Sequence, residues 1–308
     1  MERSKRGTIY YLMKYKTLFL MVLPAMLITF FLSYIPMSGI ILAFKRLNYR
    51  DGIFLSPWVG LDNFRFFIVS GRAALVTVST IGFNLVFIAT STLTAIMVAI
   101  LVAEMSGRYF KKICQSFMFL PFFISWVVVS AFMYNLFNVD NGIINTFLKA
   151  LGREPFNIYS EYWYWYIVMP ILRIWKFTGY NSVLYLAAIM GIDGEYYEAS
   201  TIDGANRFQK IFHITLPMLK PTIIILLLLS LGGILRGDFD MFYNIIGNNG
   251  LIFGKIDVID TFVFRALIGG NDIGMSTAAA FFQSVFCFLF ITLTNGIVRK
   301  ANKDYALF

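Results

Sequence analysis

Residues 198–217 read EASTIDGANRFQKIFHITLP, a polar and charged stretch that lies between two long apolar segments. Its spacing is Glu-Ala-Ser, three residues, Gly, nine residues, and then Ile-x-Leu-Pro. The positions that carry this spacing are Glu198, Ala199, Ser200, Gly204, Ile214, Leu216 and Pro217. Because both neighbouring segments are apolar enough to enter a membrane, we predict that the stretch is an exposed element that docks onto a partner.

The composition of the whole chain is that of an integral membrane protein. Hydrophobic residues make up 58% of the 308 residues and charged residues 14%, and the mean hydropathy is +0.71, which is too apolar for a soluble domain. A helix needs roughly 20 residues to cross a hydrocarbon core about 30 Å thick. Six segments meet this length: 17–44, 76–103, 113–137, 165–190, 217–234 and 276–298. The predicted fold class is an all-α integral membrane protein with six spans, because backbone in lipid must satisfy its own hydrogen bonds.

Six spans place both chain ends on one side of the membrane, and the basic residues indicate which side. Fourteen of the 26 lysines and arginines lie at the chain ends and in the two connections on that same side. They are Arg3, Lys5, Arg6, Lys14, Lys16, Arg108, Lys111, Lys112, Arg207, Lys210, Lys220, Arg299, Lys300 and Lys303. The positive-inside rule then makes this side cytoplasmic, although basic residues in the first outer loop weaken the bias. The predicted organisation is a cytoplasmic arm (1–16), a six-span domain (17–298) that contains the motif, and a cytoplasmic tail (299–308).

The chain lacks the residues that several other classes of function require. Its net charge of +9 is explained by topology and by attraction to anionic lipid, and no basic groove interleaved with aromatic residues predicts nucleic-acid binding. The single histidine, His213, excludes a histidine metal cluster, so no metal site is predicted. Residues 269–276, GGNDIGMS, imitate a phosphate loop, but Met275 stands where that loop needs lysine. We therefore expect no cofactor in this chain, and any energy from ATP must come from another chain.

The motif itself predicts a short helix, 195–206, along the cytoplasmic surface. Asp193 is suited to cap the start of this helix, and two glutamates lie near the positive end of its dipole. Gly204 is expected to adopt a positive φ and turn the chain. Pro217 suits the first turn of the next span.

The same spacing resembles the EAA motif of the permease subunits of ABC importers. The resemblance implies a six-helix type I importer transmembrane domain (MetI-like) and makes 195–206 the coupling helix, which docks onto a cytoplasmic ATPase subunit. It implies ATPase contacts for Glu198, Ala199, Ser200 and Gly204, and structural support from Ile214, Leu216 and Pro217. Ser200 departs from the family pattern, which usually has alanine at this position. The resemblance also implies that ATP and Mg²⁺ are bound by two separate ATPase subunits.

Four further stretches narrow the resemblance. Residues 174–181 (IWKFTGYN), 185–189 (YLAAI), 260–266 (DTFVFRA) and 304–308 (DYALF) resemble the LplB-like, aldouronate-type permeases for complex oligosaccharides. This implies a non-catalytic permease subunit of an importer in the bacterial cytoplasmic membrane, rather than an enzyme. It also implies a second, different permease, an extracellular solute-binding lipoprotein, and oligosaccharide substrates from plant polysaccharides, uronates or glycans.

A sugar path needs hydrogen-bonding groups and aromatic faces inside the bundle. The residues predicted to line such a path are Trp175, Lys176, Tyr180, Asn181, Tyr185, Asn135, Asp238 and Asp240. A charge at the bilayer centre costs roughly 2.5–3.5 kcal/mol, so Lys176 and Arg173 are expected to face a cavity or a partner. The alternative is that both side chains reach the outer headgroups. Asn84 and Gln283 are expected to bridge helices rather than to bind substrate.

The outer loops, 51–72, 138–164 and 237–275, mix aromatic and polar residues. They form either a platform for a partner protein or interfacial caps, and an interfacial helix is predicted to begin near Asp62.

Two other functions remain open on the sequence alone. A membrane-embedded enzyme that acts on lipid-linked sugar would use Asp238, Asp240 or Asp272, but these carboxylates form no organised constellation. An ion-coupled secondary transporter would be favoured by inverted repeats or broken helices, and the sequence shows neither.

Overall fold

The computed structural model describes residues 8–69, 71–269 and 272–307, and regular structure within these residues is helical apart from one isolated β-bridge. The α-helices are α1 Thr8–Lys14, α2 Lys16–Thr29, α3 Gly52–Leu55, α4 Asp62–Val69, α5 Arg72–Glu104, α6 Arg108–Phe123, α7 Trp126–Phe137, α8 Ile143–Ala150, α9 Trp165–Met190, α10 Gly194–Ile202, α11 Arg207–Lys210, α12 Leu216–Leu231, α13 Phe239–Ile246, α14 Gly250–Ile256, α15 Ile259–Gly269 and α16 Ile273–Ala301. This confirms the predicted all-α fold class. The positions of the sequence analysis that lie outside the described residues are Arg3, Lys5, Arg6, Gly270, Asn271 and Phe308.

Most of the predicted spans coincide with long helices. Within the described residues, four segments are long and apolar enough to cross a membrane: Lys16–Phe44, Arg72–Glu104, Arg207–Leu231 and Ile273–Ala301. The pair α6 and α7 adds a fifth if it counts as one bent span. The remaining predicted span is α9, which has 26 residues but carries charged and amide side chains along its length.

The third predicted span, 113–137, is not a single helix. α6 and α7 meet at an angle of 88°. Pro121 has no backbone N–H and so weakens the last turn of α6. Ser125 then caps α7 by accepting a hydrogen bond from the amide of Val128 at 3.4 Å. The expectation that the chain has no broken helix is therefore wrong.

The fifth predicted span, 217–234, also has different bounds. One helical segment, Arg207–Leu231, begins well before Pro217 and ends before residue 234. Asn206 and Gln209 form a capping box at its start. A π-helical turn, Ile211–Thr215, precedes the proline, which has no N–H to donate to that turn. A continuous rod therefore runs from the polar motif into the bundle.

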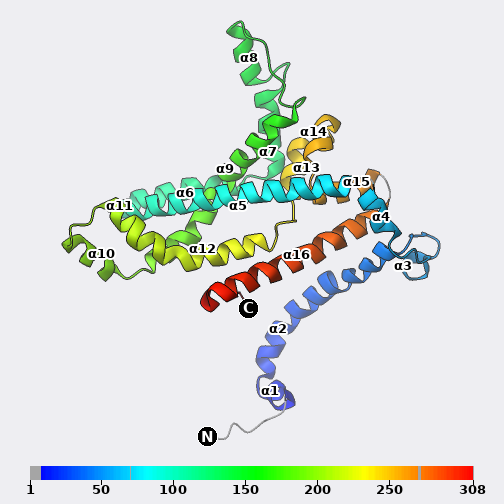
Figure 1. Cartoon of the computed structure of the whole chain (residues 1–308), viewed down its shortest axis with the longest axis horizontal. Helices are drawn as coiled ribbons and strands as arrows, with labels where there is room; N and C mark the ends of the chain where they lie inside the picture. The colour runs from blue at the N-terminus through cyan, green and yellow to red at the C-terminus, as the bar shows by residue number, and fades with distance from the viewer. Residues whose placement is uncertain (1–7, 70, 270–271, 308) are drawn as a thin grey trace.

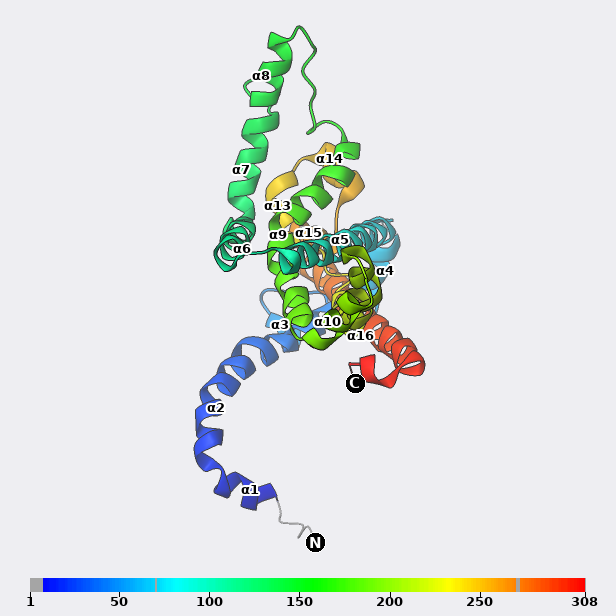
Figure 2. The same ribbon diagram turned by 90° about the vertical axis from the view of Figure 1, so that its left-hand side faces the viewer.

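The bundle is organised around α5. Figure 1 shows α5 running through the middle of the molecule with α9 crossing it, and α12 packs against both helices and against α16. α2 diverges from the bundle, and none of its side chains is buried by the rest of the chain. In Figure 2, α7 with α8 and α1 with α2 project as two arms from opposite ends of the view.

The C-terminal end of the first span is anchored by a neighbouring helix. The helix expected near Asp62 is α4, which packs against α16 and against the 3₁₀-helical end of the first span, Pro36–Phe44. The side-chain amide of Asn63 donates to the carbonyl oxygens of Leu42 and Ala43 at 3.2 and 3.0 Å. These bonds satisfy carbonyls that the end of a helix leaves without an internal partner.

The α5–α9 contact is the most extensive helix pair in the fold. Toward the C-terminal ends of both helices, Ala95 and Ala99 are fully buried against Tyr185 and Leu186. Small residues let two membrane helices approach closely and gain dispersion contacts along their length.

Gly179 lets α9 approach α6 even more closely. A Cβ at this position would lie 2.0 Å from the carbonyl oxygen of Met118. Gly179→Ala is therefore expected to lower the stability of the solubilised protein by about 1–3 kcal/mol, because such a clash forces backbone shifts. The measurement is thermal unfolding followed by fluorescence-detected size exclusion. The matched control is Gly82→Ala on α5, where a Cβ meets no atom within 4 Å. Equal midpoints for both variants would show that the contact is not tight.

Candidate functional site

The motif found in the sequence forms a short surface helix, α10. Asp193 caps its start as predicted, because its carboxylate accepts a hydrogen bond from the backbone amide of Glu195 at 3.1 Å. The helix ends at Ile202 rather than at the predicted residue 206. The reason is the turn that follows at Gly204.

Gly204 has the positive φ that the sequence predicted, +80°. The amide of Gly204 donates to the carbonyl of Thr201 at 3.1 Å, and the amide of Ala205 donates to the carbonyl of Ser200 at 2.9 Å. This pair of bonds is the Schellman arrangement that satisfies the last carbonyls of a helix. A Cβ on Gly204 would meet open space, so the requirement for glycine is one of backbone conformation.

α10 is tied to the rod Arg207–Leu231 at two points. The hydroxyls of Tyr197 and Thr215 are 2.9 Å apart, and Thr215 is buried. The ammonium of Lys210 donates to the hydroxyl of Thr201 at 2.7 Å. Because the start of α10 also follows directly on α9, the helix is held on both sides by long helices of the bundle.

The exposed face of α10 carries the residues expected to contact an ATPase. Glu198 and Ala199 are exposed, whereas Ser200 is half-buried and its hydroxyl donates to the carbonyl of Tyr197 at 2.8 Å. A shallow recess of about 360 Å³ lies beside this face. It is lined by Ser200, Asp203, Gly204, Ala205, Gln209, Lys210, His213 and Ile214.

Large apolar side chains next in sequence to the lining residues are exposed. Ile202, Phe208 and Phe212 are 87, 73 and 62% exposed. Large apolar side chains exposed on an otherwise polar segment are typical of an interaction surface. Leu216 is half-buried and Pro217 is exposed on the rod, and the supporting role expected of both stays a prediction.

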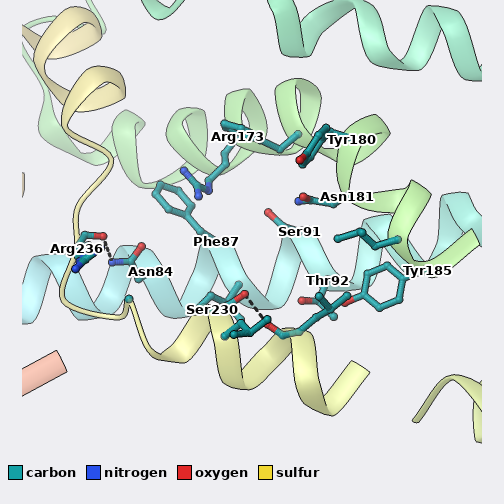
Figure 3. Close-up of a pocket in the computed structure, with 16 residues that line it drawn as sticks. Asn84, Phe87, Ser91, Thr92, Arg173, Tyr180, Asn181, Tyr185, Ser230 and Arg236 are labelled. Carbon is teal, nitrogen blue, oxygen red and sulfur yellow. Dashed lines mark hydrogen bonds between the residues drawn. The ribbon is translucent and has the colours of Figure 1, made fainter. Parts of the chain in front are cut away.

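A second candidate site is a cavity of about 490 Å³ between α5, α9 and α12 (Figure 3). Its polar lining is Asn84, Ser91, Thr92, Arg173, Tyr180, Asn181, Tyr185, Ser230 and Arg236. Phe87, Phe177 and several aliphatic side chains complete the wall. Hydroxyls, amides and flat rings together are the groups that a sugar path needs.

Three of the eight predicted path residues line this cavity. Tyr180, Asn181 and Tyr185 face it from α9, and the Tyr180 ring stacks on Phe122 with centroids 4.4 Å apart. The five that do not line it are Trp175, Lys176, Asn135, Asp238 and Asp240. Trp175, Asn135 and Asp240 are exposed on other surfaces of the chain. Asp238 takes part indirectly, through Arg173.

Lys176 was predicted to line the substrate path, but its side chain instead binds backbone carbonyls at the break between α6 and α7. Its side chain is buried, and its ammonium donates to the carbonyls of Phe122 at 3.0 Å and Pro121 at 3.4 Å, and to that of Ile124. It also lies 5.3 Å from the centre of the Trp126 ring. These carbonyls lie at the break between α6 and α7, where that of Pro121 also accepts the amide of Ile124 at 3.2 Å. Lys176 therefore caps the broken span.

Arg173 is the cationic residue of α9 that reaches the cavity. Its guanidinium lies between two rings, 4.9 Å from the centre of Phe87 and 5.0 Å from that of Phe177. One nitrogen, Nη1, donates to the carboxylate of Asp238 at 2.5 Å. The other carboxylate oxygen of Asp238 accepts from the amide of Met241 and so caps α13.

The chain unwinds after α12, and amide side chains satisfy the freed carbonyls. Asn84 donates to the carbonyls of Ile234 and Arg236 at 2.8 and 2.9 Å. Gln283 donates to the carbonyl of Leu235 at 2.7 Å. Both amides thus bridge a helix to the unwound segment after α12, and because Asn84 also lines the cavity, the prediction that it does not bind substrate stays a prediction.

Asp260 completes this junction from α15. Its carboxylate accepts from the amide of Gly237 at 2.5 Å and from the side chain of Gln283 at 2.9 Å. Burial raises the pKa of Asp260, and these hydrogen bonds oppose that rise by stabilising the charged form.

Sequence reasoning did not select Ser91, Thr92, Ser230 and Arg236. The small hydroxyls have the same appearance as Thr90, whose hydroxyl only bonds to its own helix. Helical spacing could have identified Ser91, because it lies two turns after Asn84 and therefore on the same face of the helix.

Several membrane-length helices, an exposed surface helix and a polar cavity between α5, α9 and α12 are the features expected of a membrane transport permease. Comparison with protein families identifies the family of this chain. Residues 95–303 match the family described as binding-protein-dependent transport system inner membrane component. The chain belongs to this family.

Relatives and solved structures agree with this placement. The chain is 33% identical to protein LplB of Bacillus subtilis (strain 168), covering 94% of this chain and 90% of LplB. It is 32% identical to the polygalacturonan/rhamnogalacturonan transport system permease protein YteP of the same organism, covering 98% and 94%. It also resembles a chain in the crystal structure of a bacterial ABC transporter involved in the import of the acidic polysaccharide alginate, with TM-score 0.85, 28% identity, and coverage of 95% and 98%.

The family decides between the functions that the sequence left open. The chain is an ABC transport permease and multi-pass membrane protein, neither an enzyme acting on lipid-linked sugar nor an ion-coupled secondary transporter. In the described part of the chain, no group of three or more His, Cys, Asp or Glu side chains is placed to hold a metal ion. That the chain works without a cofactor of its own stays a prediction.

Proposed function

We propose that this chain forms part of the path through which an ATP-driven importer takes up oligosaccharides. Its partners are a second permease, two cytoplasmic ATPase subunits and an extracellular solute-binding lipoprotein. The observation that carries the proposal is the connection of α10 to the cavity. α10 joins α9 directly and joins α12 through the rod Arg207–Leu231, and both helices line the cavity.

The mechanism follows from this connection. ATP and Mg²⁺ bind to the ATPase subunits, whose closure moves the docked α10. Because Tyr197 and Lys210 fix α10 to the rod, its displacement passes along α12 to Ser230 at the cavity wall. The cavity then opens outward to receive sugar from the binding protein. In this orientation both chain ends lie in the cytoplasm of a bacterial cell.

A second permease is supported by what this chain leaves uncovered. α2 diverges from the bundle with no buried side chain, and the polar cavity is walled by only three helices. A companion permease closes the open side of the path and keeps its polar groups away from lipid.

The test of this assembly is purification of the affinity-tagged chain from its native membranes in mild detergent. We expect a nucleotide-hydrolysing subunit and a second permease to co-purify with it. Glu198→Arg is expected to lower the recovered ATPase subunit at least about tenfold, because it reverses the charge at an exposed position in the middle of α10.

The matched control is Glu154→Arg, the same charge reversal at an exposed position of the outer loop. It is expected to retain all partners. Recovery of the ATPase subunit in equal amounts from wild type and Glu198→Arg would contradict the docking role of α10.

A further inference from the structure

The cavity differs in charge between its two ends. Figure 3 shows Arg173 and Arg236 at the end near Asn84, and Thr92 and Tyr185 at the other end. The first end belongs to the outer half of the chain, where α12 has already unwound. Neither aspartate nor glutamate is among the residues that line the cavity. The outer end is therefore cationic and the inner end is polar but uncharged.

The two arginines at the outer end are not equally neutralised. Arg173 donates through Nη1 to Asp238, and the rest of its five N–H donors remain available to a ligand. Arg236 is exposed and forms no ion pair within the described residues. The nearby carboxylate of Asp260 is already bonded to the amide of Gly237 and to Gln283.

An unpaired guanidinium in a polar cavity of a membrane protein points to an anionic partner. Charged side chains within spans are expensive to keep and mark the paths of charged substrates; Arg173 in α9 is such a residue, whereas Arg236 lies just beyond the end of the span Arg207–Leu231. Arginine matches a carboxylate with two parallel hydrogen bonds, which gives selectivity as well as affinity. A neutral ligand would leave Arg236 with only its longer-range electrostatic interaction with the carboxylate of Asp260.

The remainder of the cavity favours a sugar over a small inorganic anion. Ser91 has a buried hydroxyl with no hydrogen-bond partner in the described residues, and Figure 3 shows it directed between α5 and α9. Asn181 and the Tyr180 ring face the same space. Hydroxyl and amide groups beside aromatic faces suit the ring and hydroxyls of a pyranose.

We propose that this cavity binds an acidic oligosaccharide, with a sugar carboxylate at Arg236 and Arg173 and the neutral part of the chain toward Tyr185. The inference rests on the proposed function and adds the substrate class. Asp238 serves as a resident counter-ion that orients Arg173 by holding only one of its nitrogens. Arg236 supplies the charge that discriminates acidic from neutral sugars.

The experiment measures binding by the complete transporter in lipid nanodiscs without its binding protein. Equilibrium dialysis compares labelled trigalacturonate with the same trisaccharide after reduction of its carboxyl groups to alcohols. Wild type is expected to bind the acidic sugar at least about tenfold more tightly, as a hydrogen-bonded charge pair predicts. Arg236→Gln is expected to remove most of this preference while leaving affinity for the reduced sugar within about twofold. Arg236→Lys is expected to retain part of it.

Arg65→Gln on α4 is the control, because it removes an exposed arginine outside the cavity. Retained binding of the reduced sugar shows that Arg236→Gln is folded, and the lysine variant repeats the test if it is not. Equal binding of the two sugars by wild type, binding of neither, or an unchanged preference in Arg236→Gln would overturn the proposal. ATP-driven uptake of sugar by the same preparation would leave the proposed function standing in each of these cases.

Discussion

Gly204→Val is expected to reduce ATP-driven sugar uptake at least about tenfold while leaving the transmembrane bundle folded. Valine at φ +80° costs roughly 1–2 kcal/mol or more, because its branched Cβ crowds the carbonyl oxygen in the left-handed region. The chain escapes this strain by abandoning the two hydrogen bonds that end α10 at Ser200 and Thr201. The surface formed by α10 then loses its fixed shape, although a Cβ at position 204 would itself meet no atom within 4 Å.

A graded series makes this prediction sharper. Gly204→Asn is expected to retain intermediate uptake, because asparagine tolerates the left-handed conformation better than valine. Gly194→Ala, in the first turn of the same helix, is the control, because a Cβ there meets no atom within 4 Å and no positive φ is required. Uptake and ATPase activity are measured in proteoliposomes. Wild-type uptake by the valine variant would show that the turn is not part of the coupling element.

Lys176→Met is expected to destabilise the fold itself, by about 3 kcal/mol or more, since leaving each buried acceptor unsatisfied costs about 1–3 kcal/mol. Methionine fills a similar volume but donates no hydrogen bond. The carbonyls of Pro121, Phe122 and Ile124 at the break between α6 and α7 then lose their shared donor. Thermal unfolding of the detergent-solubilised protein should show a clear drop in midpoint.

Trp175→Leu is the neighbouring control, because Trp175 is 44% exposed and its loss should shift the midpoint little. A different result would support the prediction from sequence that Lys176 lines the substrate path. If Lys176→Met keeps the wild-type midpoint but loses sugar uptake, Lys176 belongs to the substrate path and not to the helix break.

The helices and the docking element were predictable because their signals are local. A sufficiently long apolar run predicts a membrane span. The fourth predicted span, 165–190, has the same bounds as α9. The turn at Gly204 was predictable for the same reason. Only one residue type adopts a positive φ without penalty, and it occurs at the expected place in the motif.

The break in the third span was not predictable, because its cause lies in another helix. The run 113–137 is apolar throughout apart from isolated polar side chains, and Pro121 alone does not show that the chain turns through 88°. What stabilises the break is the ammonium of Lys176, which is more than fifty residues away in the sequence. No periodicity in either segment reports this contact.

The residues of α9 that line the cavity were partly predictable from helical geometry. With about 100° per residue, Arg173 and Tyr180 lie on nearly the same line of α9, and Asn181 and Tyr185 lie on the neighbouring side. Lys176 is rotated by about 60° in the opposite direction. The sequence supplied this helical face, but only the packing of α5 and α12 against it decides which edge faces the cavity.

Transport of labelled sugar into sealed proteoliposomes, with ATP regenerated on the side that carries α10, is the most direct measurement. If separate ATPase subunits drive this permease, labelled sugar accumulates only when the ATPase subunits and the binding protein are both present. Accumulation then stops when either is omitted. Accumulation by the permeases alone, driven by a proton or sodium gradient, would contradict the account.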